Sequence, residues 1–218
     1  MATKKLTGAA GLSGRKAQAA RNNQLILDAA RSVFTADPGA PISAVAEQAG
    51  VGMSALYRRY RSKDELLQQL CLDGLGRYIA AAEVALAAEE DPWTAFAVFM
   101  RRCLDDGAGS LTLRFAGSFT ATDELNGLGR LAHEATQRVL DRIQSAGILR
   151  TDITVGDISL LLEQLQAVHA GDQHRSRQLR HRYLTLLLDA LHTPSTATLP
   201  GPAPSWEEIG RRYERNGL

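Results

Sequence analysis

The stretch that decides the fold is "ISAVAEQAGVGMSALYRRYRSKDELL", residues 42–67. Apolar residues recur at helical spacing on both sides of Gly50, which interrupts the pattern. The pattern predicts a short helix over 42–49, a tight turn, and a second short helix over 53–60. Ser62 precedes two acidic residues and predicts the start of a further helix, because acidic side chains stabilise the positive end of the helix dipole.

Two short helices joined by a glycine turn are the helix-turn-helix arrangement of DNA-binding proteins. Ala46 is small enough to let the two helices approach closely, and Gly50 adopts the backbone angles of a sharp turn. In the second helix, Leu56 and Tyr60 lie four residues apart, so both are expected to face the core. The polar side chains of that helix would then face outward.

The outward face of the second helix carries residue types that read DNA. Ser54, Tyr57 and Arg58 lie at spacings of three and four, and a helix fits the major groove. Arg59 and Lys63 flank this face and carry the charge that attracts phosphates. Arg58 is the predicted base-reading side chain, since a bidentate contact to guanine contributes about 1–3 kcal/mol of discrimination. The alternatives are a packing role for Tyr57, a packing role for Met53 at the start of the helix, and a solvated face for the two arginines.

Charge is divided unevenly along the chain. Residues 1–70 contain ten Lys or Arg and five Asp or Glu, a net +5, whereas residues 71–218 contain fifteen and nineteen, a net −4. Five of the basic residues lie within 1–21, which has no acidic residue and predicts a flexible basic arm. This uneven charge predicts that residues 1–70 bind a polyanion and that residues 71–218 do not. The alternative is that the uneven distribution arises by chance.

The remaining sequence also has helical periodicity, and the predicted fold class is all-α. Helices are expected at about 22–35, 62–90, 92–106, 123–146, 155–170 and 177–192, with a short one from Trp206. The apolar segment 110–119 is ambiguous between helix and strand, because no partner strand is visible. The predicted domains are a basic arm (1–21), a helix-turn-helix DNA-binding domain (22–70), a helical ligand-binding and dimerisation domain (71–193), and a proline-rich tail (194–218).

Composition and motifs argue against several other classes of protein. Cys71 and Cys103 lack CxxC spacing, which argues against a disulfide framework or a zinc ribbon. No run approaches the roughly 20 apolar residues of a membrane span, and the N-terminal residues lack the apolar core of a secretory signal. No GxSxG, P-loop or GxGxxG motif occurs. His169, His174 and His181 are not spaced to share one helical face, so no metal or cofactor is predicted.

Residues 42–67 resemble the DNA-binding head of the TetR family of transcriptional regulators. The shared features are an apolar-alanine pair at 45–46, "AGV" at 49–51, "LY" at 56–57, the aromatic Tyr60, and Lys63 followed by two leucines. The resemblance covers about residues 22–70. Beyond residue 70 only the layout is similar, namely a helical body that binds a ligand and forms the dimer.

The resemblance implies which residues touch DNA. Groove contacts are implied for Met53, Ser54, Tyr57 and Arg58, phosphate contacts for Arg59 and Lys63, and a further contact for Ser43. The chain departs from the family at Ala40-Pro41, where many members have threonines, and at Gly52, where a hydroxyl is usual. The basic arm is the expected substitute for the missing phosphate contacts.

A ligand pocket is predicted in the body, because pockets between helices are mostly apolar with few polar anchors. The family resemblance implies such a pocket as well. The expected lining residues are Trp93, Phe96, Phe99, Met100, Cys103, Phe115, Phe119, Leu128, Leu131 and Gln164. Further polar anchors are expected among Arg102, Thr112 and Gln137. The alternative for each apolar residue is plain core packing.

The last two helices of the body carry apolar stripes wider than one internal contact requires. Such stripes predict a four-helix bundle shared by two copies, which the family resemblance also implies. The expected interface residues are Ile158, Leu161, Leu162, Leu165, Tyr183, Leu184, Leu187 and Leu188. The alternative is a monomer that buries both stripes internally.

Together these features predict a ligand-responsive regulator that binds double-stranded DNA. It is expected to be a cytoplasmic repressor that binds a palindromic operator as a homodimer and is released by a small, largely apolar effector. One alternative is an architectural DNA-binding protein without an effector. The other is a helical small-molecule enzyme, although the sequence contains no assembled acid, base or nucleophile.

Overall fold

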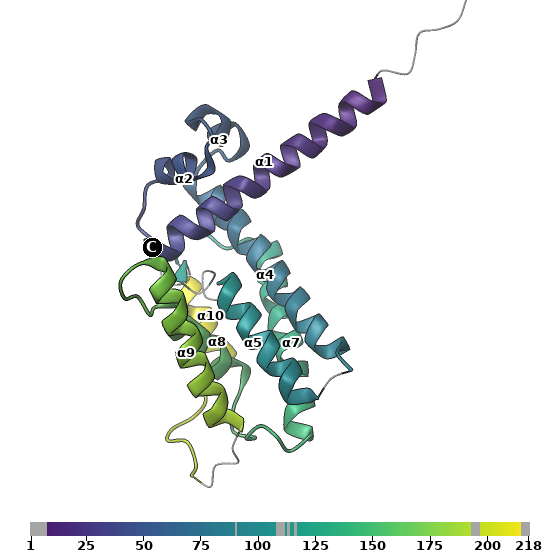
Figure 1. Ribbon diagram of the computed structural model, residues 1–218, viewed down its shortest axis with the longest axis vertical. Helices are drawn as coiled ribbons and strands as arrows, with labels where there is room; N and C mark the ends of the chain where they lie inside the picture. Colours follow the sequence, from purple (N-terminus) through teal and green to yellow (C-terminus); the bar gives the residue numbers. More distant parts are fainter. Residues whose placement is uncertain are drawn as a thin grey trace, which may run out of the picture. The chain divides into compact units, whose positions relative to one another are not determined.

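The computed structural model describes residues 8–89, 91–107, 112, 114, 115, 117–192 and 197–214. Its helices are α1 (Gly8–Ala36), α2 (Ile42–Ala49), α3 (Met53–Arg59), α4 (Lys63–Ala87), α5 (Pro92–Asp106), α7 (Asp123–Ser145), α8 (Val155–Gln166), α9 (Gln173–His192) and α10 (Trp206–Glu214) (Figure 1). No strand occurs among the described residues, and the all-α prediction is confirmed. The chain divides into two compact units between Leu66 and Leu67, just after the first turn of α4.

The first unit is built around the two short helices predicted from the sequence. Helix α1 packs against α2, and α2 contacts α3. Leu56 of α3 and Tyr60, which directly follows α3, are 0% and 2% exposed, which confirms that they face the core. Phe34 of α1 and Ala46 of α2 are buried in the same unit. Their burial holds α3 in place through its apolar side and leaves its other side uncovered.

The turn between α2 and α3 has the geometry that its glycine predicts. Gly50 has a φ of +65°, in the left-handed region that glycine adopts without steric cost. Its N–H donates to the carbonyl of Glu47 at 3.1 Å, and that of Val51 donates to the carbonyl of Ala46 at 3.0 Å. These bonds satisfy the last carbonyls of α2 and redirect the chain into α3.

Ser62 caps α4 as predicted. Its Oγ accepts the backbone N–H of Glu65 at 3.1 Å, and the Glu65 carboxylate accepts the backbone N–H of Arg61 at 2.6 Å. At the next helix start, the Asp91 carboxylate accepts the N–H of Thr94 at 2.8 Å, with Pro92 in the first helical position. Both starts were predictable because capping depends on neighbours in sequence.

Helix α1 is longer than expected. It begins at Gly8, so the predicted helix start near residue 22 and the irregular arm are wrong over 8–21. Alanines at 17, 19 and 20 are strong helix formers, and Gln18 adds a side-chain bond to Asn22 at 3.0 Å. Residues 1–7 of the predicted arm lie outside the described residues.

Two other helix boundaries also differ from the prediction. Helix α8 ends at Gln166 rather than near 170, and α9 begins at Gln173 rather than 177. Asp172 accounts for the earlier start, since its carboxylate accepts the N–H of Arg175 at 2.7 Å and caps α9. The ambiguous segment 110–119 is described only in part.

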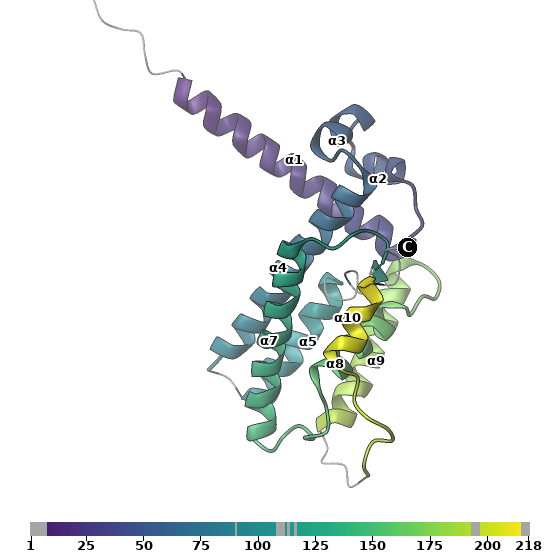
Figure 2. The ribbon, with the colours of Figure 1, turned by 180° about the vertical axis from the view of Figure 1, so that it is seen from behind.

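The second unit packs α5 against α7, α8 and α9 (Figure 1). The tail runs back along α7 and α8. Figure 2 shows its helix, α10, beside α8. Trp206 stacks against His133 of α7 with ring centroids 4.7 Å apart, and Ile209 is buried. At Gly156 of α8 the tail comes so close that a Cβ would lie 2.3 Å from the Pro204 carbonyl oxygen.

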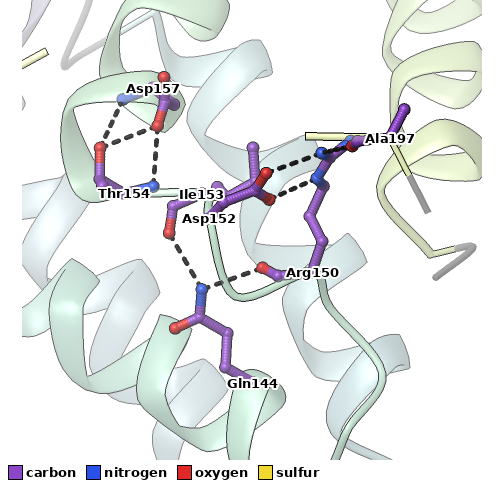
Figure 3. Close-up of polar contacts among 7 residues, drawn as sticks. All are labelled: Gln144, Arg150, Asp152, Ile153, Thr154, Asp157 and Ala197. Atoms are coloured by element: carbon purple, nitrogen blue, oxygen red, sulfur yellow. Dashed lines mark hydrogen bonds and ion pairs between the residues drawn. The ribbon is translucent and has the colours of Figure 1, made fainter. Parts of the chain in front are cut away.

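Polar side chains hold the connection between α7 and α8 (Figure 3). Gln144 donates through Nε2 to the carbonyls of Arg150 at 3.1 Å and Ile153 at 3.0 Å. Arg150 forms an ion pair with Asp152 at 2.5 Å and donates to the carbonyl of Ala197 at 2.9 Å. The connection is thereby tied to the beginning of the tail. None of the described helices is long and apolar enough to cross a membrane.

Candidate functional site

Helix α3 presents one polar face to solvent. Ser54, Tyr57, Arg58 and Arg59 are exposed, with Tyr57 at 46%, whereas Leu56 on the opposite side is fully buried. Within the described residues, the side chains of Ser54, Tyr57 and Arg58 make no hydrogen bond. The hydroxyl of Ser54, the phenol of Tyr57 and the guanidinium of Arg58 are therefore available on one face of α3.

The other predicted contact residues lie around this face. Met53, at the start of α3, is half-buried, and Ser43, in the first turn of α2, is exposed. Gly52 precedes α3 in an extended conformation, with no side chain to cap the helix. The last turn of α3 carries Arg58 and Arg59, where the negative end of the helix dipole favours cations.

Arg59 is oriented by a residue that sequence reasoning missed. Its Nε donates to Asn23 Oδ1 of α1 at 2.7 Å, and its guanidinium lies 5.4 Å from the centre of the Tyr60 ring. The buried Tyr60 hydroxyl donates to the same Asn23 oxygen at 2.5 Å. One amide oxygen thus fixes both residues at the end of α3. No local signal marks Asn23, because its partners lie 36 and 37 positions away.

Lys63 is held by its own protein. Its Nζ donates to the Ala40 carbonyl at 2.9 Å and lies 5.2 Å from the centre of the Phe34 ring. This geometry ties the start of α4 to the connection between α1 and α2. An ammonium carries three donors, so a phosphate contact by Lys63 stays a prediction that depends on its two other N–H groups.

The predicted pocket residues fall into an interior group and a peripheral group. The interior members are buried in the second unit: Phe96, Phe99, Met100, Cys103, Phe115 and Phe119. Peripheral members are Trp93, which is half-buried against His192, the half-buried Leu128, and the exposed Leu131 and Gln164. Of the expected polar anchors, Thr112 is buried, whereas Arg102 and Gln137 are exposed. The structure therefore buries the aromatic group in the second unit and leaves Leu131 and Gln164 at the surface.

The interior of the second unit also contains polar groups that the sequence did not reveal. Tyr78 shares a hydrogen bond with Thr136 at 2.9 Å, and the Thr136 hydroxyl donates to the Ala132 carbonyl at 2.7 Å. Burial raises the pKa of the Cys71 thiol to about 12 and that of Cys103 well above its ordinary value. Both thiols stay neutral at physiological pH, so neither is an activated nucleophile.

One surface groove of about 490 Å³ lies between α8 and the tail. Its lining consists of Asp157, Leu160, Leu161, Gln164, Pro202, Pro204, Glu208 and Ile209. Gln164 is its only member from the predicted pocket. Among the described residues, no three His, Cys, Asp or Glu side chains are grouped to hold a metal ion.

The predicted dimer residues also divide by burial. Ile158, Leu162, Leu165, Leu184 and Leu188 are buried within the single chain. Surface remains on the half-buried Leu161 and Leu187 and on the exposed Tyr183. Leu186, which is not among the predicted interface residues, is 56% exposed on α9. It shares the sequence pattern of its buried neighbours, and only the packing of α9 distinguishes them.

Two family models match the chain. Residues 26–70 match the model described as bacterial regulatory proteins, tetR family, and residues 91–193 match the model of the C-terminal domain of SbtR-like transcriptional regulators. Comparison with curated proteins finds no match.

Several solved structures are similar over most of their length. The TetR transcriptional regulator SCO0520 from Streptomyces coelicolor is 25% identical, with coverage of 79% of this chain and 99% of that one and a TM-score of 0.57. A TetR regulatory protein from Mycobacterium vanbaalenii is 26% identical, with coverage of 82% and 99% and a TM-score of 0.56. LfrR from Mycobacterium smegmatis, solved in complex with proflavine, is 24% identical, with coverage of 83% and 99% and a TM-score of 0.56.

Proposed function

We propose, since this chain belongs to the TetR family of bacterial transcriptional regulators, that it is a repressor that binds a palindromic operator and is released by a small effector. The observation that carries the proposal is the polar face of α3. Ser54, Tyr57 and Arg58 face solvent without internal hydrogen bonds, while Leu56 and Tyr60 anchor the same helix in the core. A helix held in this way is suited to enter a major groove.

The contacts divide into those that read bases and those that hold the backbone. Arg58 is assigned to a guanine edge, with Ser54, Tyr57 and Met53 beside it in the groove. Arg59, Lys63 and Ser43 are assigned to phosphates, which position the helix without reading sequence. Because Arg59 and Lys63 are already oriented by hydrogen bonds to Asn23 and to the Ala40 carbonyl, little side-chain entropy would be lost on binding.

The second unit is assigned to effector binding and to association with a second copy. The interior group on α5, with Phe115 and Phe119, is the proposed effector region. The proposed interface is narrowed to the side chains that keep surface in the single chain, namely Leu161, Tyr183, Leu186 and Leu187. Two copies related by a two-fold axis would present two α3 helices to a palindromic site.

Release is proposed to act through α4. This helix is continuous across the division at residues 66 and 67, so its first turn belongs to the first unit and the remainder to the second. Lys63 ties that first turn to the α1–α2 connection. An effector that displaced α4 would therefore act directly on the unit that carries α3. Differential affinity for the two arrangements sets how far the equilibrium shifts.

The test is an anisotropy titration against DNA from upstream of the protein's own coding region, repeated over a series of salt concentrations. Arg58→Ala should weaken the preferred site about 10- to 100-fold while leaving random DNA nearly unchanged. Lys63→Ala should weaken both about equally and flatten the salt dependence. Arg101→Ala, which removes an exposed arginine of α5, is the matched control and should change neither.

Two results would contradict the proposal. Steep salt dependence without sequence preference would favour the architectural alternative. Unchanged binding by both Arg58→Ala and Lys63→Ala would show that α3 is not the DNA-reading element.

A further inference from the structure

Gln166 is a polar side chain placed deep in the second unit. It is the last residue of α8 and only 2% exposed. Its Nε2 donates to the backbone carbonyl of Leu104 near the end of α5. This bond fixes the orientation of the amide, because exchanging its nitrogen and oxygen would set two acceptors against each other.

The oxygen of this amide lacks a hydrogen-bond partner among the described residues. Gln166 Oε1 is buried and accepts no hydrogen bond from any group in the described part of the chain. A buried acceptor without a donor destabilises a folded protein, so its retention calls for an explanation. Gln144 shows the contrast, since its amide spans two carbonyls, and Figure 3 shows it closing the α7–α8 connection.

The carbonyl that Gln166 contacts lies in a buried, apolar part of α5. Cys103 and Leu104 of α5 are buried beside the carbonyl that Gln166 contacts, one turn from Phe99 and Met100. Gly107 has a φ of +60° and carries no side chain, so no side chain from this position covers the Gln166 amide. A Cβ at Gly107 would lie 3.5 Å from Nε2 and 4.0 Å from Oε1. A buried water usually needs two to four polar partners, and the Leu104 carbonyl already receives the Gln166 amide.

We infer that Gln166 determines specificity in the effector region, where its Oε1 accepts a hydrogen bond from an N–H or O–H group on an otherwise apolar effector. The effector is neutral, because a cation buried against one neutral amide would lose its hydration without compensation. This inference rests on the proposed effector function and adds the chemical class of the ligand. It makes Gln166 the selective polar contact of the proposed effector region, at the end of α5.

Two probes of nearly the same shape test the inference. Indole carries a ring N–H where indene carries a CH₂ group, and their binding to the full chain is measured by ligand-observed NMR titration. The wild type should prefer indole about tenfold, since the N–H satisfies an acceptor that indene leaves unpaired. Gln166→Met keeps the length of the side chain and removes the acceptor, so the preference should fall to about one.

Gln144→Met is the matched control, because it removes an amide whose N–H groups only hold a loop. It should lower stability yet keep the tenfold preference for indole. A wild type that binds both probes equally, a preference that survives Gln166→Met, or no binding of either probe at millimolar concentration would each overturn the inference. DNA binding is measured in parallel, so a protein that prefers indole but ignores its operator would refute the proposed function and not the ligand class.

Discussion

A single side-chain oxygen contacts two residues at the end of α3, the proposed DNA-reading helix. Asn23 Oδ1 accepts hydrogen bonds from Arg59 at 2.7 Å and from the buried Tyr60 hydroxyl at 2.5 Å. One acceptor thus serves a residue that faces solvent and a residue that faces the core. The consequence is that stability of the first unit and orientation of Arg59, a proposed phosphate contact, are coupled through α1.

Asn23→Ala should lower the free energy of unfolding by about 1–3 kcal/mol, because it removes the side-chain oxygen that accepts the hydrogen bond of the buried Tyr60 hydroxyl. Tyr60→Phe removes that hydroxyl and should cost about 1 kcal/mol. The two changes together should cost less than the sum of the single effects, as measured by urea unfolding in a double-mutant cycle. Additive effects would contradict a shared hydrogen bond.

His133 is expected to make the docking of the tail depend on pH. Its ring stacks on Trp206, and its Nδ1 is buried without a hydrogen-bond partner in the described residues. Burial lowers the pKa of His133, and the nearby Glu134 opposes that shift. The unfolded chain therefore binds this proton more readily than the folded chain. Its contribution to stability is complete above the ordinary pKa of about 6.5 and is lost as the pH falls below it.

The expected result is a melting temperature that falls between pH 7.5 and pH 5, with a smaller decrease in His133→Gln. His174→Gln removes an exposed histidine of α9 and should retain the wild-type slope. In a Trp93→Phe background, Trp206 fluorescence reports release of the tail directly. An identical slope in His133→Gln would show that other groups dominate the pH dependence.

At the scale of the element, the α2–α3 turn allows backbone strain to be tested at a position where an added side chain meets no steric crowding. Gly50 and Gly52 lie two residues apart, and a Cβ at either position would meet nothing within 4 Å. Their backbones differ, since Gly50 has a φ of +65° and Gly52 a φ of −69°. The same substitution at the two sites therefore compares a left-handed with an extended backbone in the absence of steric crowding at either site.

Gly50→Ser should lower the free energy of unfolding by about 1–2 kcal/mol, because a side chain is strained in the left-handed region. Gly52→Ser should raise it by about 0.5 kcal/mol, since a serine in extended conformation caps α3 and restricts the unfolded chain. Chemical denaturation of both variants checks the pair. Equal effects at the two positions would contradict the assigned turn geometry.

At the scale of the whole molecule, the tail is part of the second unit. Close packing of Gly156 against Pro204, stacking of Trp206 on His133, and burial of Ile209 hold it against α7 and α8. This packing also forms one wall of the groove on α8. Loss of the tail would therefore change a surface next to the proposed dimer interface.

Gly156→Ala should release the tail, because its Cβ would lie 2.3 Å from the Pro204 carbonyl oxygen. Limited proteolysis should then cleave between α9 and α10 several-fold faster than in the wild type. Gly129→Ala is the control, since its Cβ would lie 3.8 Å from the Trp206 ring, which is ordinary contact. It should leave cleavage unchanged and stabilise α7 by about 0.5–1 kcal/mol. Equal cleavage of the two variants would contradict the packing at Gly156.

Features that depend on neighbours in sequence were predictable from the sequence alone. Gly50 ends α2, Ser62 begins α4, and the spacing of Leu56 and Tyr60 decides which side of α3 is buried. Each involves residues within about one helical turn, where local hydrogen bonds and side-chain periodicity determine the outcome. The family followed from these features, and so did the exposed polar face of α3 that is proposed to read DNA.

Features that depend on distant contacts were decided by the tertiary structure. Leu184 and Tyr183 are adjacent in an apolar stripe, yet only the packing of α9 in the second unit buries one and exposes the other. Asn23 reaches Arg59 across 36 positions, and Gln166 is left with an unpaired oxygen by the placement of α5 and α8. Periodicity shows that a helix has an apolar side, but the neighbouring elements determine which residues on that side lose contact with water.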